Sequence, residues 1–126
     1  MLAQAQMTTI LPVTDLQRAR AFYEGKLGLK PEGASADGKF VYACNDARLA
    51  LFPRASATKA DHTAVSFRVA DIVASIRELE RKGVVFSDYD IPGLKTVDHV
   101  CVLGSEKAAW FTDSEGNILC LHEDVA

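Results

Sequence analysis

The sequence has few cysteines, and their arrangement excludes two kinds of stabilised small domain. Only three occur among 126 residues, Cys44, Cys101 and Cys120, and no two of them stand in a Cys-x-x-Cys spacing. An odd, widely spaced set does not predict a disulfide framework, and it lacks the paired spacing of structural zinc sites. We therefore expect reduced thiols, which are typical of the cytoplasm.

Long apolar runs and an excess of basic residues are also absent. The longest apolar stretches, such as 100–103, are much too short to cross a bilayer. The first six residues have neither the basic nor the apolar region of a secretory signal, so the sequence predicts a cytoplasmic location. The formal net charge is −3, and no basic stripe is present. We expect neither a membrane nor a nucleic acid as a partner.

The composition is that of one ordinary globular domain. Apolar residues make up 48% of the chain and charged residues 25%, so a sizeable core can form. A chain of this length buries roughly two thirds of its unfolded surface. We predict a single domain over 1–126.

A weak internal repeat organises the chain. Extended apolar segments end in Val-x-Asp at 13–15 and again at 69–71, and each Asp stands where a helix N-cap belongs. Apolar residues then recur at three- and four-residue steps over 16–27 and 72–79, and a glycine follows each stretch. This pattern predicts two amphipathic helices, each ended by its glycine.

Each predicted helix is followed by β-type sequence. One hairpin is expected over 40–52 and another over 108–122, and a short strand is expected directly after each helix. The repeated unit is then βαβββ, which makes this an α+β protein. A ferredoxin-like βαββαβ domain fits less well, because each helix is followed by three strands. The predicted parts are module one over 7–53, a linker over 54–60 and module two over 61–124.

The second half contains an insertion over 88–105. Its Ile91-Pro92-Gly93 segment predicts a type II turn, with Pro and Gly in the central positions. Long loops in compact chains are more often functional than idle. Two interpretations stay open, a partly stranded decoration and a lid or rim of a pocket.

In these features the chain resembles the vicinal-oxygen-chelate superfamily, which includes glyoxalase I, bleomycin-resistance proteins and extradiol dioxygenases. The matching pieces are the two Val-x-Asp segments, Ala21-Phe22-Tyr23, Leu27-Gly28-Leu29 and Asp113-Ser114-Glu115-Gly116-Asn117, which is similar to the family's Asp-Pro-Asp-Gly-Asn signature. The resemblance implies two βαβββ modules that form an open half-barrel around one cavity. It also implies a homodimer.

The resemblance further implies where a metal ion would bind. Metal enzymes of this family place one His, Gln or Glu ligand on the first and on the last strand of each module. Carried onto this chain, those positions are Thr8, Ala50, Ala64 and Cys120. Because the two alanines offer no donor atom, we expect no metal and no other cofactor at this site.

Alternation along the strands predicts which side chains line the cavity, because residues two apart share a face of the sheet. The lining mixes apolar walls with a few polar groups, which is typical of a small-molecule pocket. The predicted ligand-binding residues are Thr8, Ile10, Arg48, Ala50, Phe52, His62, Ala64, Ser66, Trp110, Cys120 and His122.

Some of these residues also have a possible chemical role. His62, Cys120 and His122 are weak candidates for a nucleophile or an acid–base pair if they cluster at one end of the cavity. The alternative is that the two histidines are solvated at strand ends. His99 beside Asp98 in the insertion resembles an acid–base dyad, and a role as an ordinary polar surface residue is the alternative.

The sequence therefore favours a small-molecule binding protein over an enzyme. We expect metal-independent sequestration or sensing of a small organic ligand, as in the bleomycin-resistance branch of the family. The alternative is a glyoxalase- or dioxygenase-like lyase, isomerase or oxygenase that uses a metal or a histidine general base. A scaffold protein with a vestigial pocket is a third possibility.

Overall fold

The computed structural model describes residues 1–125, which form two compact units. The first unit comprises Met1–Lys59 together with Ser114–Asn117, and the second comprises Ala60–Asp113 and the last strand of the chain. The loop Ser114–Asn117 thus belongs to the first unit although it lies in the second half of the sequence. Within the described residues, no helix has the length and apolar character needed to cross a membrane.

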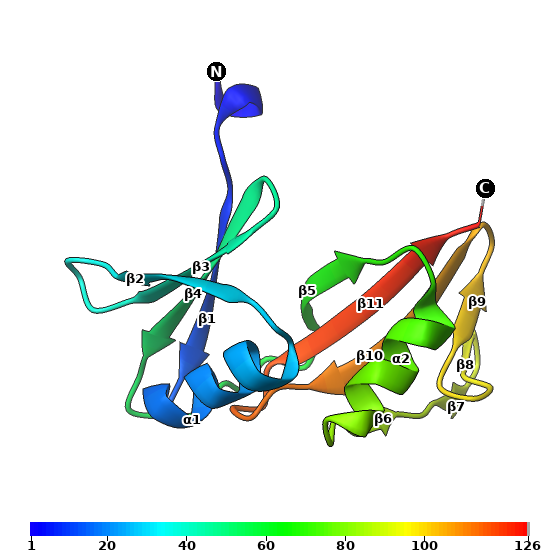
Figure 1. Cartoon of the computed structure of the whole chain (residues 1–126). Coiled ribbons are helices and arrows are strands. Elements are labelled where there is room, and N and C mark those ends of the chain that lie inside the picture. The colour runs from blue at the N-terminus through cyan, green and yellow to red at the C-terminus, as the bar shows by residue number, and fades with distance from the viewer. Residues whose placement is uncertain (126) are drawn as a thin grey trace. The chain divides into compact units, whose positions relative to one another are not determined.

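The first unit is one helix against a four-stranded sheet (Figure 1). The sheet has the order β1-β4-β3-β2, in which β1 and β4 run parallel and the other neighbours antiparallel. After a short 3₁₀ turn, η1, the elements are β1 (Thr8–Val13), α1 (Leu16–Arg20), its π-helical continuation η2 (Ala21–Lys26), β2 (Lys30–Ala34), β3 (Phe40–Cys44) and β4 (Ala47–Pro53).

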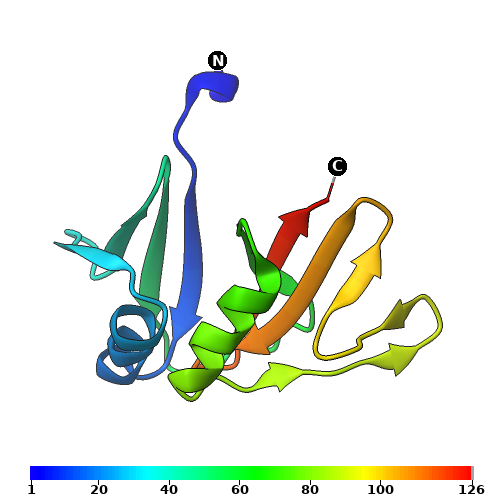
Figure 2. The same cartoon turned by 45° about the vertical axis from the view of Figure 1, so that its right-hand side comes forward.

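The second unit repeats this arrangement (Figures 1 and 2). Its sheet has the order β5-β11-β10-β6, with β5 and β11 parallel, and α2 lies across one face. The main elements are β5 (Thr63–Arg68), α2 (Ile72–Arg81), β6 (Phe86–Ser87), β10 (Glu106–Thr112) and β11 (Ile118–Asp124). The predicted α+β class and the double βαβββ repeat are therefore confirmed.

The insertion in the second unit is partly stranded. β7 (Asp90–Ile91) and β8 (Leu94–Lys95) form a small hairpin, and β9 (Cys101–Leu103) pairs with β10. Gly93 between β7 and β8 has a φ of +82°, as the third residue of a type II turn requires. The insertion therefore extends the edge of the sheet and carries a hairpin beyond it.

Both helices begin and end as their sequences predict. The Asp15 carboxylate accepts a hydrogen bond of 3.0 Å from the backbone N–H of Arg18, and Asp71 accepts one of 3.1 Å from Ala74. Gly28 and Gly83 follow the helical segments with φ values of +73° and +90°, which side chains with a Cβ rarely adopt. Local capping chemistry thus sets the helix boundaries in both units.

Each sheet buries one face against its own helix, and this is where the two cores lie. Alternate strand residues point to that face, so the opposite face of each sheet carries the remaining side chains. The first core contains Leu11, Val13, Ala19, Phe22, Tyr23, Phe40, Tyr42, Leu49 and Leu51. The second contains Ile72, Ile76, Val84, Phe86, Ala109, Phe111, Leu119 and Leu121. We call the opposite side of each sheet its open face.

The carboxylate of Glu115 anchors the loop Ser114–Asn117 to the start of α1. It accepts hydrogen bonds from the backbone N–H groups of Thr14 at 2.9 Å and Asp15 at 3.1 Å, and from the Arg18 guanidinium at 2.8 and 3.0 Å. The Glu115 side chain is only 1% exposed. The hydrogen bond from Arg18 is the main reason why the pKa of Glu115 falls to about 2.

Replacing Glu115 by alanine is expected to destabilise the protein by about 2–4 kcal/mol, since it removes the acceptor of two backbone N–H groups and the partner of Arg18. Urea unfolding at pH 7 measures this loss. Glu78→Ala is the matched control, because its exposed carboxylate lies 3.9 Å from Lys82 and contributes at most about 0.5 kcal/mol.

The same variant tests the charge of Glu115. The folded-state pKa of about 2 lies below the ordinary value of 4.5, so the stabilisation is present above pH 4.5 and is lost as the pH falls toward 2. The difference in unfolding free energy between wild type and Glu115→Ala should therefore shrink over this range. A difference that stays constant from pH 7 to pH 2 would contradict the ionic role.

Candidate functional site

The open face of the second sheet brings together four of the predicted site residues. Ser66 on β5 is paired in register with Cys120 on β11, and Cys120 is opposite Trp110 on β10. His122 lies two residues further along β11, on the same face. The neighbouring strands β5, β11 and β10 thus present a continuous surface, which we call the Ser66–His122 face.

Ser66 and His122 form a close polar pair at this surface. The Ser66 Oγ lies 2.6 Å from the Nδ1 of His122. When the ring is neutral with its proton on Nε2, the serine hydroxyl donates to Nδ1. Within residues 1–125, Nε2 of His122 has no hydrogen-bond partner in the protein, so it is available to a ligand. Among the described residues, no carboxylate orients this ring as in a serine hydrolase triad.

Cys120 is a buried thiol and not an activated one. It is 5% exposed, and its Sγ donates a hydrogen bond to the carbonyl of Leu121 at 3.2 Å. Burial raises the pKa of the Cys120 thiol above its ordinary value. Reactive cysteines have lowered pKa values and good access, so this environment argues against Cys120 as a nucleophile.

Trp110 provides a half-buried aromatic surface beside the polar pair. Its indole N–H donates to the Thr63 hydroxyl at 3.2 Å, and its ring meets that of Tyr89 edge-on, with ring centres 5.5 Å apart. The two contacts fix the indole plane. An aromatic surface next to hydrogen-bonding groups is a common composition for a small-molecule site.

The structure does not bring His62 into this group. His62 is exposed and precedes β5, and its one hydrogen bond within the described chain joins its Nδ1 to the carbonyl oxygen of Thr63 at 3.2 Å. Of the two interpretations of His62, its position matches the solvated strand end and not a cluster with Cys120 and His122. Ser66 takes the position beside His122, while Ala64 is half-buried at an irregularity in the pairing of β5 with β11.

The remaining predicted residues lie on the open face of the first sheet. Thr8 and Ile10 on β1 are exposed and are paired with Arg48 and Ala50 on β4. Ala50 is fully buried among its neighbours. Phe52, one face position further along β4, is flanked by the cationic heads of Lys39 at 5.9 Å and Arg54 at 5.4 Å from its ring centre.

Arg48 is already engaged within the first unit. Its guanidinium forms an ion pair with Glu32 and a hydrogen bond with Gln6. A ligand that binds the predicted site residue Arg48 would have to displace these contacts. The Glu32 pair lies at the surface, where such pairs contribute little stability.

The four positions that the sequence resemblance assigns to metal ligands do not have the chemistry of a divalent cation site. Ala50 and Ala64 have no donor atom, and Thr8 and Cys120 supply one hydroxyl and one buried thiol. Within residues 1–125, no three His, Cys, Asp or Glu side chains are grouped so that they could hold a metal ion. A site of this kind needs three or four nitrogen or oxygen donors.

His99 has a different partner from the one that its sequence neighbours suggest. Its Nδ1 lies 2.8 Å from the Asp88 carboxylate and its Nε2 3.3 Å from that of Glu80. The hydrogen bond with Asp88 is the main reason why the pKa of His99 is raised. The pairing with Asp98 that the sequence suggested is thus wrong, because the turn directs His99 toward α2.

Comparison with known proteins gives the relationship of the whole chain. A family model described as the Glyoxalase/Bleomycin resistance protein/Dioxygenase superfamily matches residues 4–121. The comparison with curated protein sequences finds no match.

Several solved structures are similar to this one at 18–20% identity, which shows a shared fold alone. A superfamily member from Sphaerobacter thermophilus DSM 20745 has a TM-score of 0.76 at 18% identity, over 98% of this chain and 100% of that one. TnmS3, an antibiotic binding protein from Streptomyces sp. CB03234, has a TM-score of 0.69 at 20% identity, over 98% of both chains. Lactoylglutathione lyase from Agrobacterium tumefaciens has a TM-score of 0.70 at 20% identity, over 95% of this chain and 93% of that one.

The burial of the thiols predicts their order of modification. Iodoacetamide at pH 7.5 should alkylate the half-buried Cys44 first, because Cys101 and Cys120 are buried and react only when the chain opens. Mass spectrometry of peptides at successive times measures the three rates, and the same reaction in urea is the control. If Cys120 reacts first in the folded protein, it is an activated thiol and the interpretation above is wrong.

Proposed function

The chain belongs to the Glyoxalase/Bleomycin resistance protein/Dioxygenase superfamily, and we propose that within this family it binds a small organic molecule without a metal ion. The observation that carries this proposal is the Ser66–His122 face. There, an aromatic wall of Trp110 and Tyr89 stands beside a hydrogen-bonded serine–histidine pair.

The face offers the two kinds of contact that an aromatic ligand needs. A planar ring system buries its surface against the indole of Trp110, and burial of apolar area contributes roughly 25 cal/mol per Å². A ligand carbonyl or hydroxyl accepts a hydrogen bond from the free Nε2–H of His122, while Ser66 holds the ring in that tautomer. Ala64 leaves room because its side chain is a single methyl group.

Metal independence follows from the donor set. The chemistry of the family's metal enzymes depends on a cation that polarises two vicinal oxygen atoms. Here, alanine at two of the four ligand positions leaves too few donors to offset the hydration that such a cation loses. Binding on this face therefore rests on stacking and hydrogen bonds alone.

Sequestration or sensing is the biological role that fits binding without chemistry. The structural similarity to TnmS3, described as an antibiotic binding protein, supports an antibiotic-like ligand. The three unpaired thiols support a cytoplasmic location, and the family resemblance supports a homodimer.

An enzyme that uses His122 as a general base is the second candidate. The 2.6 Å contact between Ser66 and His122 is the observation in its favour, because a hydroxyl held against an imidazole is a common nucleophile–base arrangement. Within the described chain, no carboxylate orients the ring of His122, and this makes an enzyme the weaker candidate. Recovery of a bound ligand unchanged after long incubation would separate binding from turnover.

Trp110 is the only tryptophan of the chain, so its fluorescence reports directly on the proposed site. A screen of anthraquinone, bleomycin-type and other aromatic antibiotics in the presence of EDTA should yield compounds that quench this fluorescence saturably. The double variant Trp110→Phe, Val85→Trp is the control. This variant moves the tryptophan to position 85, where the side chain is 83% exposed. Its fluorescence should not be quenched saturably by the same compounds.

The two histidines provide a matched pair of variants for any compound so found. His122→Ala should weaken binding by about tenfold, because the hydrogen bond from Nε2 to the ligand is lost. His62→Ala should leave the affinity unchanged, since His62 lies outside the cluster. The proposal fails if no compound quenches Trp110, or if the two variants weaken binding equally.

A further inference from the structure

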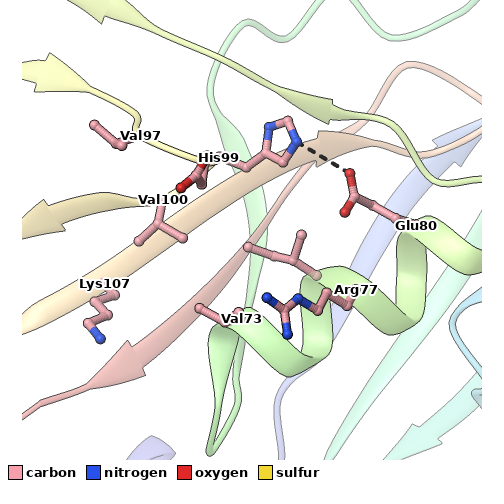
Figure 3. Close-up of a pocket in the computed structure, with 9 residues that line it drawn as sticks. Val73, Arg77, Glu80, Val97, His99, Val100 and Lys107 are labelled. Carbon is pink, nitrogen blue, oxygen red and sulfur yellow. Dashed lines mark ion pairs between the residues drawn. The ribbon is translucent and has the colours of Figure 1, made fainter.

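The second unit has a pocket on the helix-covered side of its sheet, opposite to the Ser66–His122 face. It has a volume of about 540 Å³ and lies between α2, residues 97–100 of the insertion, and Lys107 on β10 (Figure 3). All of its lining residues belong to the second unit. This volume is in the range of small-molecule sites. The insertion therefore forms a pocket rim as well as a stranded decoration.

Apolar side chains form the inner wall of the pocket. Ile76 on α2 is buried at its base, and Val100 is half-buried. Two more valines are unusually accessible, with Val73 44% exposed and Val97 66% exposed. Clusters of exposed apolar side chains around a concavity mark places where a ligand is bound.

The rim is a tight turn with a fixed conformation. The backbone N–H of Val97 donates to the carbonyl of Val100 at 2.8 Å, and that of Val100 donates back at 3.0 Å. Between them, Asp98 and His99 have φ values of +52° and +72°, which cost free energy in residues other than glycine. The contacts of His99 with Asp88 and Glu80 hold this turn in place. The pocket is thus preformed.

Two cationic side chains line the pocket, Arg77 on α2 and Lys107 on β10. Neither Arg77 nor Lys107 forms an ion pair within residues 1–125, whereas Glu80 is engaged with His99. Figure 3 shows the guanidinium of Arg77 directed toward Val73, one turn earlier on α2, and away from Glu80. The remaining acidic group of the lining, Asp98, lies in the rim turn beside His99. The two free cations therefore adjoin the apolar wall.

We propose that this pocket is a second ligand site, which binds a small carboxylate with an apolar body. Arg77 and Lys107 hold the carboxylate, and Val73, Ile76 and Val97 cover the body. A guanidinium matches the two oxygens of a carboxylate, and Lys107 adds a second positive charge. The site is independent of the Ser66–His122 face, because the two lie on opposite sides of the sheet of the second unit.

The test uses 4-phenylbutyrate as the probe and the uncharged 4-phenylbutyramide as its matched analogue. Each is titrated into the ¹⁵N-labelled full chain, and backbone amide shifts are followed by NMR. The carboxylate should shift amides of α2 and of residues 97–100 saturably, and the amide analogue should bind at least about tenfold more weakly. Equal binding of the two compounds would overturn the assignment of a carboxylate.

Charge variants separate specific recognition from general attraction. The double variant Arg77→Gln, Lys107→Gln should bind 4-phenylbutyrate at least about tenfold more weakly than wild type does. Its amide spectrum without ligand should otherwise be unchanged. Arg81→Gln, in the last turn of α2 and outside the pocket lining, should bind as wild type does. An equal loss with Arg81→Gln overturns the proposal. Amide shifts confined to β5 and β11 also overturn it, and they would leave the proposed function of the open face standing.

Discussion

The buried carboxylate of Glu115 is the contact on which both the first helix and the last hairpin depend. It accepts hydrogen bonds from the backbone N–H groups of Thr14 and Asp15 and from the guanidinium of Arg18, and so fixes the start of α1. The same residue lies in the loop that joins β10 to β11. The hairpin that this loop closes pairs Trp110 with Cys120. The candidate site is built on that register.

Two surfaces of different chemistry follow from the arrangement of the second unit. The open face of its sheet combines an indole with a hydrogen-bonded serine–histidine pair, which suits an aromatic ligand with polar groups. The side covered by α2 combines valines with the unpaired cations Arg77 and Lys107, which suits an anion with an apolar body. Neither surface offers the set of hard donors that a divalent cation needs.

The sequence predicted what depends on neighbours along the chain. The caps at Asp15 and Asp71 and the two hairpins rest on local chemistry and on alternation, and the structure has all of them. It missed contacts between distant segments, because no local pattern encodes them. Glu115 was visible only as part of a turn signature, and the pairing of His99 with Asp88 crosses the insertion. His62 was misplaced because β5 begins one residue after it.

We have proposed that alanines at two positions where related enzymes would carry metal ligands leave a site for an organic ligand instead. Equilibrium dialysis against Ni²⁺, Zn²⁺, Mn²⁺ and Fe²⁺, followed by elemental analysis of the chelator-free protein, tests it most directly. We expect far less than one metal ion per chain, and none that depends on Cys120 or His122. One tightly bound ion per chain that is lost in the Cys120→Ala, His122→Ala double variant would contradict it.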